Sequence, residues 1–187
     1  MKCDLSSTIP VRSTILGSPT TMLNPTELPQ SVRGIFSAAG WKADRQVPVP
    51  APVPHEHPAY AVLSEFGGLT VGRNGAGKEC AKHKLVFGYI EPDREVLRWT
   101  DLLQSQLVGV ADIEAGHGEL YVDASGRWFF RSCIHDAFAF EGASLAEAME
   151  CELLGRRSQP MLRPDQSRVV MWGKVFTPDD PRIYRYR

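Results

Sequence analysis

Apolar residues follow a helical period near the start of the chain and a strand-like period further on. A stripe at helical spacing over residues 32–39 predicts a first helix that ends at Gly40. A second helix is expected over residues 56–65. The apolar residues then alternate over residues 69–73 and 84–90, which predicts two strands joined by a glycine-rich loop.

The helical period returns once and then gives way to a second series of strands. Asp93 is placed to cap a third helix over residues 94–107, which Gly109 is expected to end. A series of strands follows, at residues 110–113, 119–123 and 127–134. The turn between the last two strands, Asp123–Gly126, places glycine where a positive φ is common.

One more helix completes the predicted domain. Ser144 and Glu147 form a capping box for residues 145–154, and Gly155 is expected to stop this helix. Two helices that lead into hairpin-joined strands, with further helices between them, are typical of the α+β class. We therefore predict an antiparallel or mixed sheet with helices packed on one face.

The two ends of the chain differ from this central part, residues 29–155. Residues 1–28 are polar and interrupted by proline, which predicts a disordered segment. Residues 156–187 form a basic extension, in which residues 168–176 are expected to add a packed strand and the rest a tail. The alternative is an arm that stacks its aromatic residues on single-stranded nucleic acid, but the extension carries many apolar residues for a solvated arm.

Composition narrows the class of protein. The chain has 187 residues and 43% hydrophobic content, which suits a single domain with a sizeable core. No run approaches about eighteen consecutive apolar residues, so neither a membrane span nor a secretory signal is expected, and the predicted location is the cytoplasm. The four cysteines lack a framework spacing, so we expect reduced thiols.

The net charge of −1 conceals an uneven distribution. Residues 89–155 carry thirteen acidic and four basic residues, whereas residues 156–187 carry eight basic and three acidic ones. A nucleic-acid-binding domain should present a basic face on its core, and this core is acidic. A basic protein is therefore the expected partner, and no nucleic acid, membrane or small-molecule substrate is expected.

Three chemical interpretations of the sequence compete with simpler ones. The loop Gly72–Lys78 matches G-x-x-x-x-G-K of nucleotide-binding loops, but Glu79 replaces the hydroxyl residue that ligates magnesium, and no helix follows. A zinc site could be built from four scattered residues of suitable type: Cys80, His83, Cys133 and His135. Their spacing is unusual, so unrelated thiols and histidines are favoured, and neither a metal nor another cofactor is expected. No nucleophile has an orienting base, so we predict a protein that is not an enzyme.

The acidic centre is the hypothesised partner-binding surface. Its carboxylates belong to Glu91, Asp93, Glu95, Asp112, Glu114 and Glu119. Trp128 and Phe129 are neighbours on a predicted strand and point to opposite faces, so one of them should be exposed, and Trp128 is the hypothesised aromatic anchor. The alternative is a solvated surface that only keeps the protein soluble.

Several motifs in a fixed order resemble the SUKH superfamily, in particular its third immunity-protein family. They are AGW with Arg45 downstream, LSEFGGL (residues 63–69), VGVADI (108–113), GHGELYVDASGRWF (116–129) and GASLAEAMECELLG (142–155). The resemblance covers residues 28–155. Its structural motif positions here are Trp41, Phe66, Gly67, Gly68, Asp123, Gly126 and Arg127.

The resemblance implies an intracellular, non-enzymatic α+β protein that binds and neutralises a cognate polymorphic toxin, often a nuclease or deaminase, in bacteria. No catalytic residues carry over. The sequence departs from the family pattern at VADIEAG, where a Pro-Ile-Gly-like stretch is common, and in its proline-rich connector and basic extension. Two alternatives remain: a regulatory scaffold related to the fungal cell-wall members of the superfamily, and a nucleotide-binding enzyme that uses the Gly72–Lys78 loop.

Overall fold

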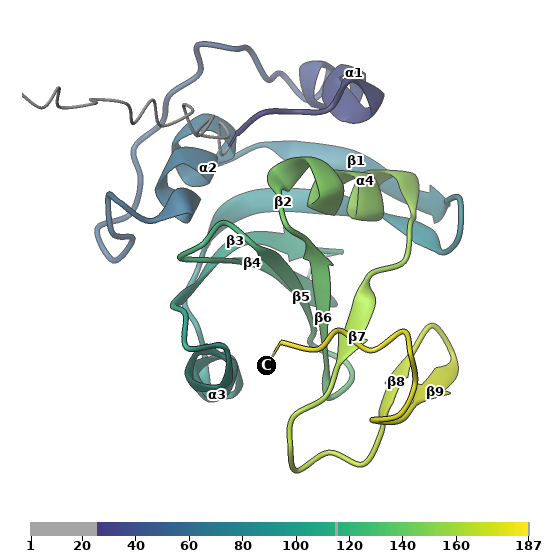
Figure 1. The fold of residues 1–187 in the computed structure, drawn as a ribbon. Helices are drawn as coiled ribbons and strands as arrows, with labels where there is room; N and C mark the ends of the chain where they lie inside the picture. Colours follow the sequence, from purple (N-terminus) through teal and green to yellow (C-terminus); the bar gives the residue numbers. More distant parts are fainter. Residues whose placement is uncertain (1–25, 115, 187) are drawn as a thin grey trace, which may run out of the picture.

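A seven-stranded sheet forms the centre of the computed structural model, which describes residues 26–114 and 116–186 (Figure 1). All neighbouring strands are antiparallel and follow one another in chain order. They are β1 (Thr70–Ala76), β2 (Ala81–Ile90), β3 (Leu107–Ile113), β4 (Gly118–Asp123), β5 (Trp128–Ser132), β6 (Ala137–Gly142) and β7 (Gln159–Met161). The predicted α+β class with an antiparallel sheet is confirmed.

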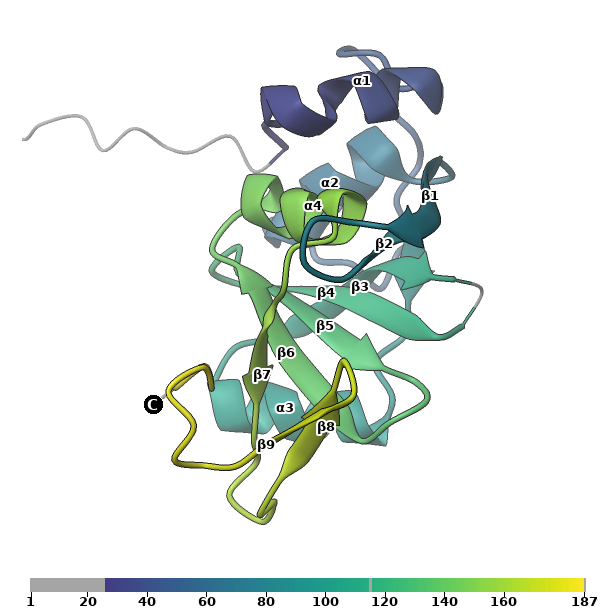
Figure 2. The same ribbon diagram turned by 90° about the vertical axis from the view of Figure 1, so that its right-hand side faces the viewer.

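Helices cover the sheet on both sides. Three of them, α1 (Gln30–Ala38), α2 (Pro58–Phe66) and α4 (Leu145–Leu154), pack on one side, which we call the helix side (Figures 1 and 2). The fourth, α3 (Arg94–Leu103), packs on the opposite side together with residues 177–186, the C-terminal tail. We call this second face the tail side.

This covering overturns the expectation that Trp128 or Phe129 is exposed. Trp128 is 1% exposed and packs on the helix side, and Phe129 is 0% exposed and packs on the tail side. The two side chains do point to opposite faces, as their places on a strand require. The prediction was wrong because it assumed that only one face of the sheet is covered.

The ends of the helices follow the predicted caps in most places. The Asp93 carboxylate accepts hydrogen bonds from the N–H groups of Glu95 and Val96, at 3.0 and 3.1 Å, and so begins α3. However, α3 ends at Leu103, because Gln104 adopts a left-handed conformation. Gly109, the predicted terminator, lies within β3, where a Cβ atom would approach the backbone oxygen of Ile90 to 2.6 Å.

The caps of α4 are close to the prediction. Ser144 Oγ accepts a hydrogen bond from the N–H of Glu147 at 3.3 Å, while the Glu147 carboxylate accepts one from the N–H of Ala143 rather than from Ser144. Gly155 ends the helix in the left-handed region with φ of 67°. The capping box is therefore present in a form shifted by one residue.

The C-terminal extension wraps around the edge of the sheet at β7. Instead of the single strand predicted over residues 168–176, it forms a hairpin of β8 (Val169–Met171) and β9 (Lys174–Phe176). The chain then returns to the tail side, where the ring of Tyr184 stacks on Phe140 with centroids 4.0 Å apart. Of the segment predicted to be disordered, residues 1–25 lie outside the described part, while Leu28 is buried.

Over the described residues, none of the helices is long and apolar enough to cross a membrane.

Candidate protein-interaction surface

Pairing of the strands places two of the predicted acidic residues side by side on the tail side. Asp112 on β3 lies opposite Glu119 on β4, and Glu119 lies opposite Arg131 on β5. Residues directly opposite each other on antiparallel strands share one face of the sheet. The register therefore makes a row of two carboxylates and one guanidinium group.

Arg131 holds two of the carboxylates in place. Its Nη1 donates to Glu119 Oε2 at 2.9 Å, and its Nη2 donates to Asp93 Oδ2 at 2.6 Å. The hydroxyl of Tyr121 also donates to Glu119, at 2.7 Å. Burial alone would lower the pKa of Arg131, but the two carboxylates raise it above its usual value. The three charges thus have a fixed geometry with one net negative charge.

Glu95 is neutralised by the C-terminal extension. Arg163 forms ion pairs with Glu95, with Asp136 at 2.8 Å and with Asp165 at 3.3 Å, and its side chain is only 7% exposed. The hydrogen bond from Arg163 lowers the pKa of the Asp136 carboxyl. The basic extension therefore compensates part of the acidic centre within the same molecule.

The remaining acidic residues lie near the turn between β3 and β4 and in the loop before α3. Glu114 lies 3.4 Å from His117 Nδ1 and 3.9 Å from His83 Nε2. Asp112 accepts a hydrogen bond from the N–H of Gly116 at 3.1 Å. Glu91 is exposed, two residues before the cap of α3. Strand pairing and Arg131 therefore bring Asp112, Glu119 and Asp93 together, while Glu91, Glu95 and Glu114 lie apart from them.

Ile134, rather than Trp128, offers an apolar anchor beside these carboxylates. Its side chain is 61% exposed in the turn between β5 and β6. It lines a hollow of about 450 Å³, together with Glu95, Arg131, Asp136 and Arg163. Sequence reasoning assigned Ile134 to a strand and did not consider it, because an isolated isoleucine at the end of a strand carries no pattern of its own.

The residues of the structural motif near α2 hold the connector against this helix. Trp41 Nε1 donates to the Glu65 carboxylate at 2.8 Å. The guanidinium group of Arg45 donates to the backbone oxygens of Glu65 and Gly67, at 2.7 and 2.6 Å. A Cβ atom on Gly67 would lie 2.5 Å from the oxygen of Leu63. Phe66 is fully buried, and Gly68 has a φ of 80°.

The other part of the motif closes the hairpin between β4 and β5. Asp123 is 0% exposed, and its Oδ1 accepts hydrogen bonds from the N–H groups of Ser125 and Arg127, both at 2.9 Å. Its Oδ2 pairs with the Arg127 guanidinium group, and Gly126 has a φ of 86°. Burial alone would raise the pKa of Asp123, but Ser125 and Arg127 lower it below its usual value. These contacts are structural, and the predicted hairpin is confirmed.

The glycine-rich loop packs on the end of α4. The N–H of Lys78 donates to the oxygen of Leu154 at 2.9 Å, and the N–H groups of Glu79 and Cys80 donate to the oxygen of Gly155, at 2.7 and 3.0 Å. The predicted hairpin between β1 and β2 is confirmed. A phosphate-binding loop needs free N–H groups. In this loop the corresponding N–H groups bond to the C-terminus of α4, so they do not point at a phosphate group.

The four residues weighed as zinc ligands have other neighbours. His83 Nδ1 lies 2.6 Å from Glu152 Oε2, and Cys80 Sγ donates to the oxygen of Arg156 at 3.1 Å. Cys133 and His135 lie in the exposed turn after β5. Burial raises the pKa of Cys80 to about 11, which favours a protonated thiol. Within residues 26–114 and 116–186, no group of three or more potential ligands could hold a metal ion.

The fold and its surface together define a class: an α+β protein whose charged face is fixed by internal ion pairs. The family model of the SUKH-3 immunity protein matches residues 28–155, more than half of the chain. The protein therefore belongs to the SUKH-3 immunity protein family, and the resemblance inferred from its motifs is confirmed. No curated protein and no solved structure matches the chain.

Proposed function

We propose that this protein binds a cognate toxin of the nuclease or deaminase type and neutralises it by covering its active cleft. The match of residues 28–155 to an immunity-protein family carries the proposal. The protein acts in the cytoplasm of a bacterium with a polymorphic toxin system and performs no chemical step of its own. Inhibition is stoichiometric, because each molecule of this protein blocks one toxin molecule for as long as the complex lasts.

The acidic surface is the proposed contact, defined as Glu91, Asp93, Glu95, Asp112, Glu114 and Glu119. An enzyme that acts on nucleic acid has a basic cleft, and negative potential speeds association with such a cleft. Arg131 already holds Asp93 and Glu119 in one arrangement. Binding therefore orders few side chains, which lowers its entropic cost.

Asp112 adds a reason why this surface should accept a cation from outside. It lies directly opposite Glu119, and like charges at such positions repel each other. The guanidinium group of Arg131 pairs with Glu119 and Asp93, and within the described residues it forms no ion pair with Asp112. A lysine or arginine of the toxin placed beside Asp112 would relieve this repulsion. Ile134 would supply the apolar contact at the same site.

Association kinetics with the product of the adjacent gene test the proposal. Asp112→Lys combined with Glu91→Lys should slow association about tenfold at low salt and much less at high salt. Ile134→Ser should mainly speed dissociation, because it removes a desolvated contact. Asp44→Lys combined with Glu56→Lys, on two exposed residues before α2, is the charge-matched control and should leave both rates unchanged.

Equal association rates for the double variant and the control would contradict the proposed surface. Failure of the unmodified protein to bind or inhibit the toxin would contradict the proposed function itself.

A further inference from the structure

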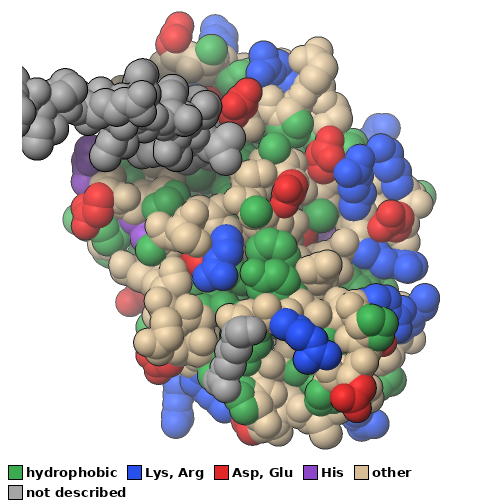
Figure 3. All heavy atoms as spheres, viewed as in Figure 1, with side chains coloured by type: hydrophobic (Ala, Val, Ile, Leu, Met, Phe, Trp, Pro, Cys, Tyr) green, Lys and Arg blue, Asp and Glu red, His purple; other side chains and the backbone are tan. Residues whose placement is uncertain are grey.

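The hairpin of β1 and β2 carries cations that the rest of the molecule does not neutralise. Arg73, Lys78, Lys82 and Lys84 all lie on it, and within the described part of the chain none of them forms an ion pair. Figure 3 shows Lys and Arg side chains gathered at the right-hand edge, over the tip of this hairpin. Arg131 and Arg163 on the tail side differ, because both are bound to carboxylates.

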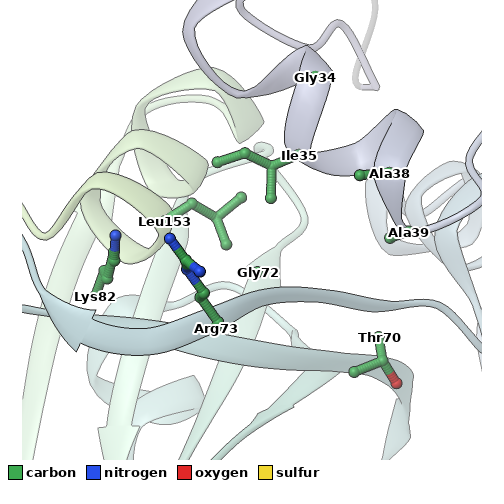
Figure 4. A pocket seen from close by; sticks show the side chains of 9 residues that line it. All are labelled: Gly34, Ile35, Ala38, Ala39, Thr70, Gly72, Arg73, Lys82 and Leu153. Carbon is green, nitrogen blue, oxygen red and sulfur yellow. The ribbon is translucent and has the colours of Figure 1, made fainter.

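Two of these cations line a groove on the helix side. The groove has a volume of about 460 Å³ and lies between α1, β1 and α4 (Figure 4). Arg73 and Lys82 stand beside Leu153 at one end of it, as Figure 4 shows. The described residues that line the groove include these two cations and no carboxylate.

The floor of the groove is apolar. Ile35 of α1 is half-buried, and Leu153 of α4 is 3% exposed. Gly72 lets β1 approach this floor, because a Cβ atom there would lie 2.6 Å from Leu153 Cδ2. β1 is also the terminal strand of the seven-stranded sheet, so an extended chain can reach the groove along its open edge.

We propose that this groove binds an acidic segment of a second protein. An apolar side chain of the segment rests on Ile35 and Leu153, and its carboxylates pair with Arg73 and Lys82. Charge complementarity carries this assignment, since the groove combines uncompensated cations with an apolar floor. The site is separate from the proposed toxin contact, because Glu119 and Arg131 lie on the tail side.

Nucleic acid is the less suitable occupant. The described residues that line the groove include no aromatic ring on which a base could stack. The N–H groups of Lys78, Glu79 and Cys80, which could have bound a phosphate group, donate to α4 instead. An acidic peptide needs neither feature, since side-chain ion pairs and one apolar contact suffice.

Fluorescence anisotropy with the full-length protein tests this inference. The probe is a short fluorescein-labelled peptide rich in glutamate with one central leucine. Arg73→Glu combined with Lys82→Glu should weaken its binding at least about tenfold. Ile35→Ser should weaken binding of the leucine peptide but not of a version with serine in place of leucine. Arg168→Glu combined with Lys174→Glu, an equal charge change at two exposed positions of the C-terminal extension, should leave binding unchanged.

Circular dichroism and thermal unfolding confirm that each variant is folded, which is expected because the exchanged side chains are at least partly exposed. The inference is wrong if the unmodified protein does not bind the peptide, or if Arg168→Glu with Lys174→Glu weakens binding as much as the groove variant. It is also wrong if a single-stranded oligonucleotide of equal charge binds more tightly at Arg73 and Lys82 than the peptide does.

Discussion

The two sides of the sheet are covered by different parts of the chain. On the helix side, α1, α2 and α4 bury aliphatic and aromatic side chains, and all three helices lie within the matched residues 28–155. On the tail side, α3 shares its cover with Tyr184 and Tyr186, which lie outside that match. Ion pairs of Arg163 fasten the extension to α3. The matched residues 28–155 thus cover the helix side by themselves, while residues 156–187 help to cover the tail side.

Truncation of a core ring should show the largest contrast between the sides. Phe66 on the helix side is 0% exposed and packs against Phe36 and Phe87, with centroids 5.1 and 5.5 Å apart. Phe66→Ala should lower the free energy of unfolding by about 3–5 kcal/mol, measured by urea denaturation. The surrounding rings cannot collapse fully into the space that it leaves.

The variant compared with it in the C-terminal tail is Tyr184→Ala. The Tyr184 ring is only partly buried, although it stacks on Phe140. Its loss should cost about 1 kcal/mol. Equal losses of stability for the two variants would show that the C-terminal tail is packed as tightly as the core on the helix side, and the contrast drawn above would be wrong.

An intermediate effect is expected from Arg163→Met. This change removes charge-assisted hydrogen bonds to Asp136 and Glu95 while keeping most of the side-chain volume. It should lower the free energy of unfolding by about 2 kcal/mol, because the partner carboxylates remain partly solvated. The difference from the unmodified protein should shrink as salt is added.

Arg168→Met is the matched control for this variant, since Arg168 is exposed in the same extension. It should change stability by no more than about 0.5 kcal/mol. If Arg163→Met were equally mild, the extension would be held by its apolar contacts rather than by ion pairs.

Short-range patterns were sufficient for much of the fold. Asp93, Ser144 and Gly155 cap their helices through residues at most four positions away, so local sequence predicts them. The predicted end of α3 was wrong because the local pattern favours glycine as a helix terminator, and so indicates Gly109 rather than Gln104. Gly109 serves the contact between β2 and β3, which is a tertiary requirement that the local pattern does not contain.

The candidate surface was less accessible to sequence reasoning. Composition identifies carboxylates but not their partners, and Glu95 is separated from Arg163 by 68 positions. Alternation on β5 correctly predicts that Trp128 and Phe129 point to opposite faces. It does not predict that α3 and the C-terminal tail cover the tail side. The uncompensated cations of the β1–β2 hairpin also became visible only after the other ion pairs were known.

A change of pH should alter the free energy of unfolding less than the substitutions above, but it should act through groups on one side of the sheet only. On the tail side, arginine neighbours lower the pKa of Asp136 and Asp123, so these pairs stay charged at neutral pH. On the helix side, burial lowers the pKa of His83, but its hydrogen bond to Glu152 outweighs this and raises the pKa above 6.5. Burial also raises the pKa of Glu141 well above 4.5.

Both shifts on the helix side act in the same direction. A group whose pKa is higher in the folded state stabilises the fold fully at a pH below its unfolded pKa, and this stabilisation is lost as pH rises through its folded pKa. The unfolded pKa is 6.5 for His83 and 4.5 for Glu141. The free energy of unfolding should therefore fall as pH rises, above 4.5 for the contribution of Glu141 and above 6.5 for that of His83. His83→Gln should reduce this slope, and His83→Gln with Glu141→Gln should nearly remove it.

Asp136→Asn is the tail-side control for this experiment. The folded state lowers the pKa of Asp136, so its contribution is present above 3.8 and is lost only as pH falls through the folded value. The variant should be less stable than the unmodified protein by a constant amount between about pH 5.5 and about pH 8.5, with the same slope. A slope that persists in the His83 and Glu141 double variant but disappears in Asp136→Asn would place the titrating groups on the tail side and reverse the comparison.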